Sequence, residues 1–335
     1  MEIIRGLHNI RPEHRGCVAT IGNFDGVHRG HQMMLEQLIA KADELGVPSL
    51  LITFEPLPRE YFQRGELPPR LTRFREKITL LSRTRIDRVL CIPFNKQLAQ
   101  IPAETIVDDL LVKRLGIHHV LVGDDFRFGN GAAGDYALLK RKGESANNAD
   151  DHRFGVGQMQ TLTVVGERAS STRVREALGR GDFGLAQKLL GYPYFIMGRV
   201  VYGRQLGRQL GVPTADIRLQ RYKAALEGVF AVRVNGLDRD YTGIANIGVR
   251  PTVEGKEPLL EVHIFNFSGD IYGQLLRVTF SHKLRDEQKF DGLDALKTQI
   301  HADMIQAQDW FKANPQDETD NVSSDIRDRE QGSNS

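Results

Sequence analysis

Two histidines stand inside a glycine-rich string near the beginning of the chain, where a strand-like pattern gives way to a helical one. The string is Gly22-Asn23-Phe24-Asp25-Gly26-Val27-His28-Arg29-Gly30-His31. Because His28 and His31 are three residues apart, they can share one face at the start of a helix. Imidazoles there can donate hydrogen bonds to phosphoryl oxygens, and the free N–H groups of a helix start also favour phosphate. The string therefore predicts a site for phosphate chemistry.

The string matches neither of two familiar nucleotide motifs. The chain has no Gly-x-x-x-x-Gly-Lys-Ser/Thr, and the glycine spacing differs from Gly-x-Gly-x-x-Gly. A tight turn with two surface histidines is the plain alternative for His-x-x-His alone. The whole string between a strand and a helix favours a ligand site, because α/β folds bind ligands at the carboxyl ends of parallel strands.

A second glycine-rich string covers residues 198–216 and ends in Gly211-Val212-Pro213-Thr214-Ala215-Asp216. Its backbone N–H groups suit phosphates. Thr214 and Asp216 offer hard oxygen ligands for Mg²⁺, to be completed by nucleotide phosphates and water. A glycine-rich loop without a ligand is the plain alternative. Residues 259–267 alternate as a strand does, which places Glu261 and His263 on one face.

The elements that must position these residues differ between the two halves of the chain. In the first half, apolar runs alternate with helical patterns, which is typical of a parallel sheet covered on both faces. In the second half, short β-rich runs broken by glycines predict a small antiparallel barrel or sandwich, closed by one helix from Leu293 to Trp310. The expected strands are 17–21, 49–54, 88–92 and 119–122, and then 195–202, 229–234, 243–247, 259–267 and 275–280.

The length and the change of pattern predict two domains. We expect an α/β domain over residues 1–187 and a β-barrel domain over residues 188–314. The remaining residues, 315–335, hold only two aliphatic side chains, Val322 and Ile326, and are predicted to be a disordered tail.

Charge and cysteine content exclude several classes of protein. The net charge is +2, so no global field favours nucleic acid or a membrane surface. No run approaches 18 apolar residues and no signal peptide is expected, so we predict a cytoplasmic protein. Cys17 and Cys91 lie in apolar runs and are expected to be buried free thiols. A basic run over residues 70–88, which includes Lys77, favours the solvent face of a helix, with an anion-attracting rim as the alternative.

The first string resembles the His-x-Gly-His signature of the nucleotidyltransferase superfamily and, as a whole, the bacterial bifunctional riboflavin kinase/FAD synthetase family. Residues 53–60 resemble that family's second motif, with Leu57 where a polar residue is expected. Residues 123–129 resemble its flavin-contacting loop, and residues 170–175 resemble the superfamily's second phosphate-binding motif. The resemblance implies catalytic roles for His28, His31 and Arg173. It also implies ATP-binding roles for Gly22, Asn23, Phe24, Asp25, Gly26, His28, His31, Ser171, Thr172 and Arg173, and flavin-binding roles for Asp125, Phe126 and Phe128.

The second string resembles the Gly-x-Pro-Thr-Ala-Asn signature of riboflavin kinases, with Asp216 in place of the asparagine. A carboxylate still binds Mg²⁺, but it adds negative charge beside ATP. The resemblance makes Glu261 the catalytic base, a sensible role because riboflavin offers a neutral alcohol. It further implies ATP-binding roles for Gly203, Gly207, Gly211, Pro213 and Thr214, metal-binding roles for Thr214 and Asp216, and flavin-binding roles for Asn246, Arg250 and Arg285.

Several of these residues also have a plainer interpretation. Phe126 and Phe128 could be core aromatics, Arg173 could be a solvated arginine near a helix cap, and Arg285 could form a structural salt bridge. Asn266 stands where the family is expected to have an aspartate.

The resemblance implies an amino-terminal Rossmann-like nucleotidyltransferase domain and a carboxy-terminal riboflavin kinase barrel. The implied reactions use ATP with Mg²⁺ to phosphorylate riboflavin to FMN and then to adenylylate FMN to FAD. The implied partners are the small molecules riboflavin, FMN and ATP, without nucleic acid or membrane, and a homo-oligomer is left open.

Three alternatives stay open. A class I aminoacyl-tRNA synthetase shares His-x-Gly-His but needs a tRNA surface. A coenzyme A-pathway adenylyltransferase leaves the second half unexplained. A non-catalytic flavin-binding protein would be yellow but would consume no ATP.

Overall fold

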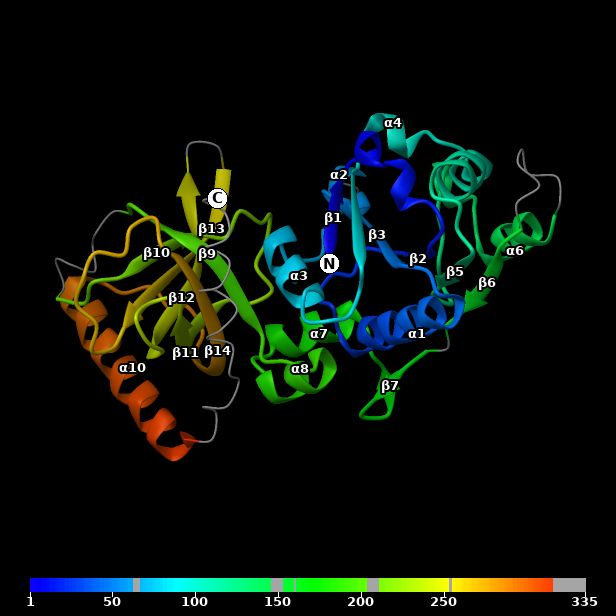
Figure 1. Ribbon diagram of the computed structural model, residues 1–335. Coiled ribbons are helices and arrows are strands. Elements are labelled where there is room, and N and C mark those ends of the chain that lie inside the picture. The colour runs from blue at the N-terminus through cyan, green and yellow to red at the C-terminus, as the bar shows by residue number, and fades with distance from the viewer. Residues whose placement is uncertain (63–66, 146–152, 160, 204–210, 253–254, 316–335) are drawn as a thin grey trace. The chain divides into compact units, whose positions relative to one another are not determined.

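A six-stranded sheet forms from the apolar runs of the first half, in the order β1-β4-β3-β2-β5-β6 (Figure 1). All its neighbouring strands are parallel, which confirms the predicted sheet. The sequence patterns did not identify its two edge strands, β1 and β6. The bounds are β1 (Glu2–Arg5), β2 (Val18–Ile21), β3 (Ser49–Glu55), β4 (Arg88–Pro93), β5 (His119–Val122) and β6 (Gly155–Gln158).

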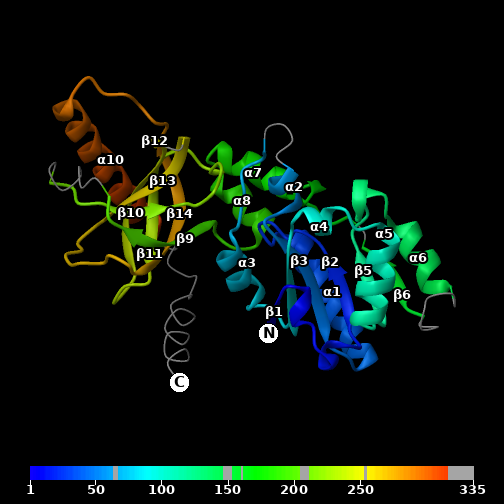
Figure 2. The same cartoon turned by 90° about the horizontal axis from the view of Figure 1, so that it is seen from above.

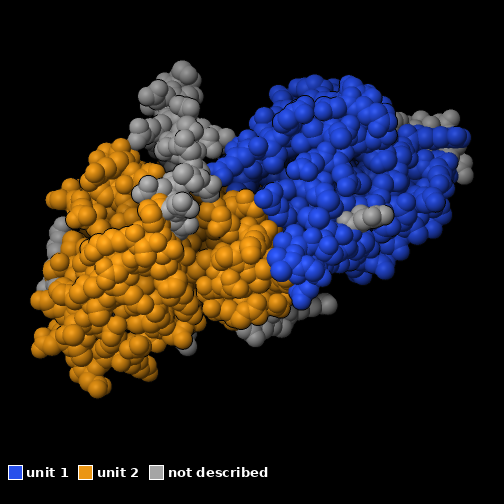
Figure 3. Space-filling model, turned by 90° about the horizontal axis from the view of Figure 1, so that it is seen from below, with its two compact units in different colours: residues 1–67, 77–170 blue, residues 68–76, 171–335 orange. Residues whose placement is uncertain are grey.

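The structure is a computed structural model that describes residues 1–62, 67–145, 153–159, 161–203, 211–252 and 255–315. The side chains of residues 249–257 also lie outside this description. The chain divides into two units: unit 1 contains residues 1–67 and 77–170, and unit 2 contains residues 68–76 and 171–335 (Figure 3). The predicted tail lies outside the described residues except for Pro315. The predicted domain boundary between residues 187 and 188 stays a prediction. It assigns the first segment to one site and the second segment to the other.

Helices cover both faces of the sheet in unit 1. Helix α1 (Arg29–Leu45) contacts β2 and β3, and the hydroxyl of Thr20 donates to Sδ of Met34 on this helix at 3.2 Å. As predicted, α1 ends at Gly46, whose φ of +65° caps it. The other elements of this part of the chain are η1 (Leu7–Asn9), η2 (Pro12–His14), α2 (Pro58–Phe62), α3 (Phe74–Leu81), α4 (Lys96–Ala99), α5 (Ala103–Thr105), the π-helical η3 (Ile106–Arg114), η4 (Asn130–Ala132), α6 (Tyr136–Glu144), β7 (Thr163–Val164) and β8 (Glu167–Arg168).

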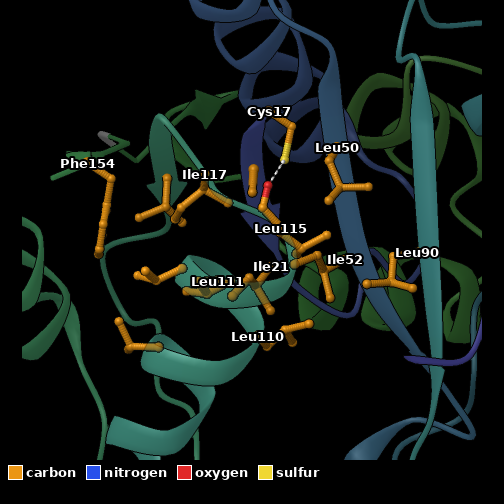
Figure 4. Close-up of a cluster of buried hydrophobic side chains, with 14 of the residues drawn as sticks. Cys17, Ile21, Leu50, Ile52, Leu90, Leu110, Leu111, Leu115, Ile117 and Phe154 are labelled. Atoms are coloured by element: carbon orange, nitrogen blue, oxygen red, sulfur yellow. Dashed lines mark hydrogen bonds between the residues drawn. The ribbon is translucent and has the colours of Figure 1, made fainter. Parts of the chain in front are cut away.

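The opposite face of the sheet packs against η3. Leu110 and Leu111 lie in one cluster with Ile21 and Ile52, which come from neighbouring strands (Figure 4). Cys17 is fully buried in the same cluster, and burial raises the pKa of its thiol to about 12, so it stays protonated. Cys17 and Cys91 are both buried and free, as predicted. Together α1 and η3 explain why the strands read as continuous apolar runs.

Unit 2 contains a closed antiparallel barrel with the strand order β10-β13-β12-β11-β14-β9, which confirms the predicted barrel. Strand β10 was not among the expected strands. Helix α10 (Leu293–Ala313) lies along the outside of the barrel and contacts β11, β12 and β14 (Figures 1 and 2). None of the described helices is long and apolar enough to cross a membrane. The bounds are α7 (Ser171–Gly179), α8 (Phe183–Leu190), β9 (Phe195–Val201), β10 (Ala215–Arg218), β11 (Gly228–Asn235), β12 (Tyr241–Thr252), β13 (Gly255–Ile264) and β14 (Leu275–Arg285).

A buried ion pair ties residues 68–76 to the rest of unit 2. Arg221 donates through Nη2 to the carboxylate of Glu76, with 2.6 Å to Oε1, and both side chains have at most 1% of their surface exposed. The other guanidinium nitrogen, Nη1, donates to the carbonyl of Leu71 at 3.1 Å and to the hydroxyl of Tyr194 at 3.0 Å. The Glu76 carboxylate also accepts from the backbone N–H of Met197 at 2.9 Å. These hydrogen bonds help to offset the cost of burying two charges.

We expect Arg221→Met to lower the free energy of unfolding of unit 2 by about 3–5 kcal/mol, because it leaves the Glu76 carboxylate buried without its cation. Calorimetry of the full chain should show the loss. The exposed Arg180, changed to Met as a control, should cost less than about 0.5 kcal/mol. Equal effects of the two changes would contradict a structural role for the buried pair.

Candidate active sites

The histidine string forms the turn between β2 and α1 in unit 1. The N–H of Gly22 continues the sheet by donating to the carbonyl of Ile52 at 3.0 Å. His28 is the N-cap of α1, and its Nδ1 accepts the backbone N–H of His31 at 3.4 Å. The turn therefore lies at the carboxyl end of a central parallel strand, where α/β folds bind ligands.

Three aromatic rings stack along this turn. The rings of His28 and His31 lie 3.7 Å apart with an interplanar angle of 20°, and Phe24 lies 4.6 Å from His31 on a tilt of 30°. Phe24, Asp25 and His28 are all buried. The two histidines are thus brought together, as their spacing predicts, and they are not the surface histidines of the plain alternative.

His31 is held as a neutral imidazole. Burial lowers its pKa well below the ordinary value, and the neighbouring His28 and Lys77 lower it further. Its Nδ1 is buried and has no hydrogen-bond partner within the part of the chain that the structure describes. A neutral ring with an unsatisfied nitrogen is suited to bind a polar group of a ligand.

Glycine at position 30 allows the rings and the chain to approach closely. A Cβ there would lie 3.2 Å from the ring of His28 and 3.4 Å from the carbonyl of Ala169. A side chain would therefore push on the ring that caps α1. The requirement explains why the motif carries Gly30 between Arg29 and His31.

Lys77 is a site residue that the sequence analysis missed. It was placed on the solvent face of a helix, and the structure contradicts this because its side chain is fully buried. Its Nζ donates to the carbonyl of Asn23 at 2.6 Å and to the hydroxyl of Thr53 at 3.2 Å. No sequence signal indicated this burial, because Lys77 belongs to a run of basic residues and its hydrogen-bond partner Asn23 is 54 positions away.

The predicted flavin-contacting loop, residues 123–129, follows β5 in unit 1. The rings of Phe126 and Phe128 stack 5.3 Å apart, and both are partly buried against the core cluster. Asp125 forms an ion pair with Arg168 of β8 at 3.1 Å. Arg168 also pairs with Asp124 at 3.0 Å. The two rings therefore offer a partly exposed aromatic surface beside an exposed charged network.

The charged network lowers the pKa of Asp124. The hydrogen bond from Thr161 is the largest cause, and Arg168 adds to it. The Asp124 carboxylate is therefore ionised at neutral pH. Sequence patterns gave no sign of Arg168, which lies 44 positions from Asp124.

The predicted second phosphate-binding motif begins α7, which belongs to unit 2. Ser171 is the first residue of this helix, in agreement with the predicted helix start. Ser171 and Arg173 are partly buried and Thr172 is exposed. Their proposed part in ATP binding therefore concerns a different unit from the one that holds His28 and His31.

Glu261 stands between two polar side chains of neighbouring strands in the barrel. On β13 it lies opposite Asp216 of β10 and opposite Asn246 of β12. Residues directly opposite one another point to the same face of a sheet, so the three side chains share one face. Thr214 lies two positions before Asp216, just ahead of β10. The arrangement brings together the predicted base and the predicted metal ligands.

Two contacts hold the segment around Pro213 and Asp216 in place. His263 of β13 is hydrogen-bonded through Nδ1 to the carbonyl of Pro213 at 2.8 Å. A Cβ at Gly203 would lie only 1.7 Å from Oδ2 of Asp216, so only glycine fits there. Of the other predicted ATP-binding glycines, Gly211 is exposed, and Gly207 lies outside the described residues.

The predicted flavin-binding residues of unit 2 are engaged within the protein. The side chain of Asn246 donates to Oε1 of Glu287 at 3.4 Å. Arg285 forms a two-fold contact with Asp303 of α10, at 2.9 Å from Nε and 2.8 Å from Nη2. This contact is the structural salt bridge of the alternative interpretation. The side chain of Arg250 lies outside the described part of the chain.

The predicted metal ligands of the barrel site, Thr214 and Asp216, both offer oxygen atoms. Within the described residues, no group of three or more histidines, cysteines, aspartates or glutamates could hold a metal ion. A metal at Thr214 and Asp216 would therefore depend on substrate phosphates and water for its remaining ligands, as Mg²⁺ usually does.

Comparisons with known proteins divide the chain in the same way as the two sites do. A family model described as FAD synthetase matches residues 10–173, and one described as riboflavin kinase matches residues 190–311. A relative from Pseudomonas fluorescens named bifunctional riboflavin kinase/FMN adenylyltransferase is 50% identical, over 92% of this chain and 97% of its own length. A relative of the same name from Escherichia coli (strain K12) is 44% identical, over 93% of this chain and 98% of its own.

A solved structure extends the likeness to the whole fold. The crystal structure of a protein named macrolide-efflux protein from Streptococcus pneumoniae is 29% identical and superposes with a TM-score of 0.75. The match covers 92% of this chain and all of the other. The name of that protein differs from the names of the two relatives, which agree with each other and with both family models.

Proposed function

The chain belongs to the family of bifunctional riboflavin kinases/FMN adenylyltransferases, and we propose that it performs both reactions at the two sites described above. At the barrel site, ATP and riboflavin give FMN and ADP. At the histidine site, ATP and FMN give FAD and diphosphate. Residues of this chain carry out the two steps in different ways, because the two nucleophiles differ.

Adenylyl transfer at the histidine site needs positioning more than proton transfer. An oxygen of the FMN phosphate attacks the α-phosphorus of ATP, and diphosphate leaves. The second pKa of a phosphate monoester is about 6, so the attacking oxygen is already anionic at pH 7 and needs no base. His28, His31 and the N–H groups at the start of α1 would hold the phosphates. The stacked, neutral His31 supports this role because its Nδ1 is still unsatisfied.

Phosphorylation at the barrel site needs a base, since the primary alcohol of riboflavin is neutral. Glu261 would accept the alcohol proton while the oxygen bonds to the γ-phosphorus and ADP leaves. The position of Glu261 supports this assignment, because directly opposite residues share one face of a sheet and this places Glu261 beside the predicted metal ligand Asp216.

We propose Mg²⁺ as the metal of the barrel site, with Thr214 and Asp216 as its protein ligands. Both offer hard oxygens, which Mg²⁺ prefers. The absence of a side chain at Gly203 lets the carboxylate of Asp216 approach the backbone there. When bound, the metal would offset the charge of the ATP phosphates. We further propose that the protein works in the cytoplasm on small molecules alone.

The observation that carries this proposal is that unit 1 holds the stacked rings of His28 and His31, whereas unit 2 holds Glu261 between Asp216 and Asn246. Pure protein incubated with riboflavin, ATP and Mg²⁺ should form FMN first and FAD later, with one ADP and one diphosphate per FAD. Chelation of the metal should stop both steps. Bound flavin without any consumption of ATP would instead support a non-catalytic flavin-binding protein and would overturn the proposal.

A further inference from the structure

Lys77 is a buried cation beneath the turn that carries His28 and His31. None of its side-chain surface is exposed, and its Nζ lies 2.6 Å from the carbonyl oxygen of Asn23. The hydroxyl of Thr53, on β3, lies 3.2 Å from Nζ and 3.4 Å from the same carbonyl. All three residues belong to unit 1. The ammonium group therefore lies at the carboxyl ends of β2 and β3, where the sheet offers its ligand site.

The ammonium group makes this contact as a charged donor. Hydrogen bonds from a charged donor are stronger than those from a neutral one, so the ammonium group holds the Asn23 carbonyl more firmly than a neutral amide would. Its charge also helps to keep the pKa of His31 low, after burial and after His28.

The hydrogen bond from Lys77 fixes the direction of one peptide group in the turn. The Asn23–Phe24 peptide is trans, so its carbonyl and its N–H point in opposite directions. With the carbonyl held by Lys77, the N–H of Phe24 points away from it, and this N–H has no acceptor among the described residues. Phe24 and Val27 have φ angles of +47° and +36°, which are unfavourable for residues with side chains. Such a turn needs an anchor to keep its shape.

We propose that Lys77 is a positioning residue of adenylyl transfer, whose ammonium group holds the Asn23–Phe24 peptide so that the Phe24 N–H is aimed at the phosphates of ATP. This inference rests on the proposed function of the histidine site. A donor aimed in advance at developing charge acts mainly on turnover, because the charge to be bound is largest in the transition state. Lys77 should therefore affect kcat for FAD formation more than the KM for ATP.

Three changes separate the hydrogen bond from the charge. Lys77→Met removes both, Lys77→Gln keeps a donor without charge, and Lys77→Arg keeps both. Lys41→Met serves as the matched control, since Lys41 lies on α1 in a surface ion pair with Glu44. The rate of FMN formation by each variant is the internal control for the amount of active protein. The variants are compared only if the wild-type protein forms FAD.

The expected order of kcat for conversion of FMN to FAD is wild type, Lys77→Arg, Lys77→Gln and Lys77→Met. The kcat of Lys77→Met should be about 100-fold or more below that of wild type, as for loss of one oriented donor. Its KM for ATP should stay within about threefold of the wild-type value. Its rate of FMN formation should also stay within about threefold of wild type. A Lys77→Met variant within threefold of wild-type kcat, or one changed only in KM, would overturn the inference. If Lys77→Met does not fold, Lys77→Arg must still exceed Lys77→Gln, and equal kcat values for these two would overturn it. Failure of wild-type protein to form FAD would instead reject the proposed function.

Discussion

Glu261→Gln should abolish formation of FMN from riboflavin while conversion of FMN to FAD continues at close to the wild-type rate. Glutamine keeps the size and one oxygen of the side chain but cannot accept the proton of the riboflavin alcohol. Loss of a positioned general base costs about 10²–10⁴-fold in rate. Because residue 261 lies within strand β13, the substituted side chain should stay on the face that Asp216 and Asn246 share. The measurement is the initial rate of FMN formation and, separately, of FAD formation from supplied FMN.

The matched control for this change is Glu227→Gln. Glu227 is exposed and belongs to the same unit, so its change should leave both rates unaltered. If Glu261→Gln kept more than a tenth of the kinase rate, another group would have to remove the proton. If it lost both activities in a folded protein, Glu261 would not belong to one site alone.

His31→Ala should have the opposite effect, with FAD formation lowered by about 10²–10³-fold and FMN formation unchanged. This is the loss expected when one donor to the developing phosphoryl charge is removed. His28→Ala should lower the same rate, since the ring of His28 stacks on His31 at 3.7 Å and caps the N–H of that residue. The exposed His301 on α10, changed to Ala, is the control and should alter neither rate.

The pH dependence of FAD formation gives a second, independent test of His31. Because the pKa of His31 is lowered well below its ordinary value, the ring stays neutral through the range around pH 6. The rate should nevertheless fall as the pH drops through about 6, because the FMN phosphate gains a proton there. His31→Asn should be slower at every pH but keep this acid limb at the same position. A limb that moves or disappears in His31→Asn would mean that His31 itself titrates in that range.

The parallel sheet and the barrel could be predicted because the patterns that indicate their strands and helices lie within short stretches of the sequence. Strands buried on both faces read as continuous apolar runs, and α1 is bounded by a cap and by Gly46. The edge strands β1 and β6 were missed because they are short and partly exposed. Strand β10 was missed because its four residues, Ala215–Arg218, include two charged side chains and give too short a pattern.

Which charged side chains are buried could not be predicted, because the contacts that bury them are distant in sequence. Lys77 meets Asn23 across 54 positions, and Arg221 meets Glu76 across 145. In the sequence, Lys77 is one of several basic residues in a run that favours a solvent-exposed face. Only the folded chain shows that this residue turns inward while its neighbour Arg75 stays exposed.

The two-site account is tested most directly by mixing two variants that each lack one activity. His31→Ala supplied with riboflavin, ATP and Mg²⁺ should accumulate FMN, and Glu261→Gln should leave riboflavin unchanged. A mixture of the two should form FAD, because FMN released by one is adenylylated by the other. A mixture that accumulates FMN but forms no FAD, while wild-type protein forms FAD, would contradict two independent sites in one chain.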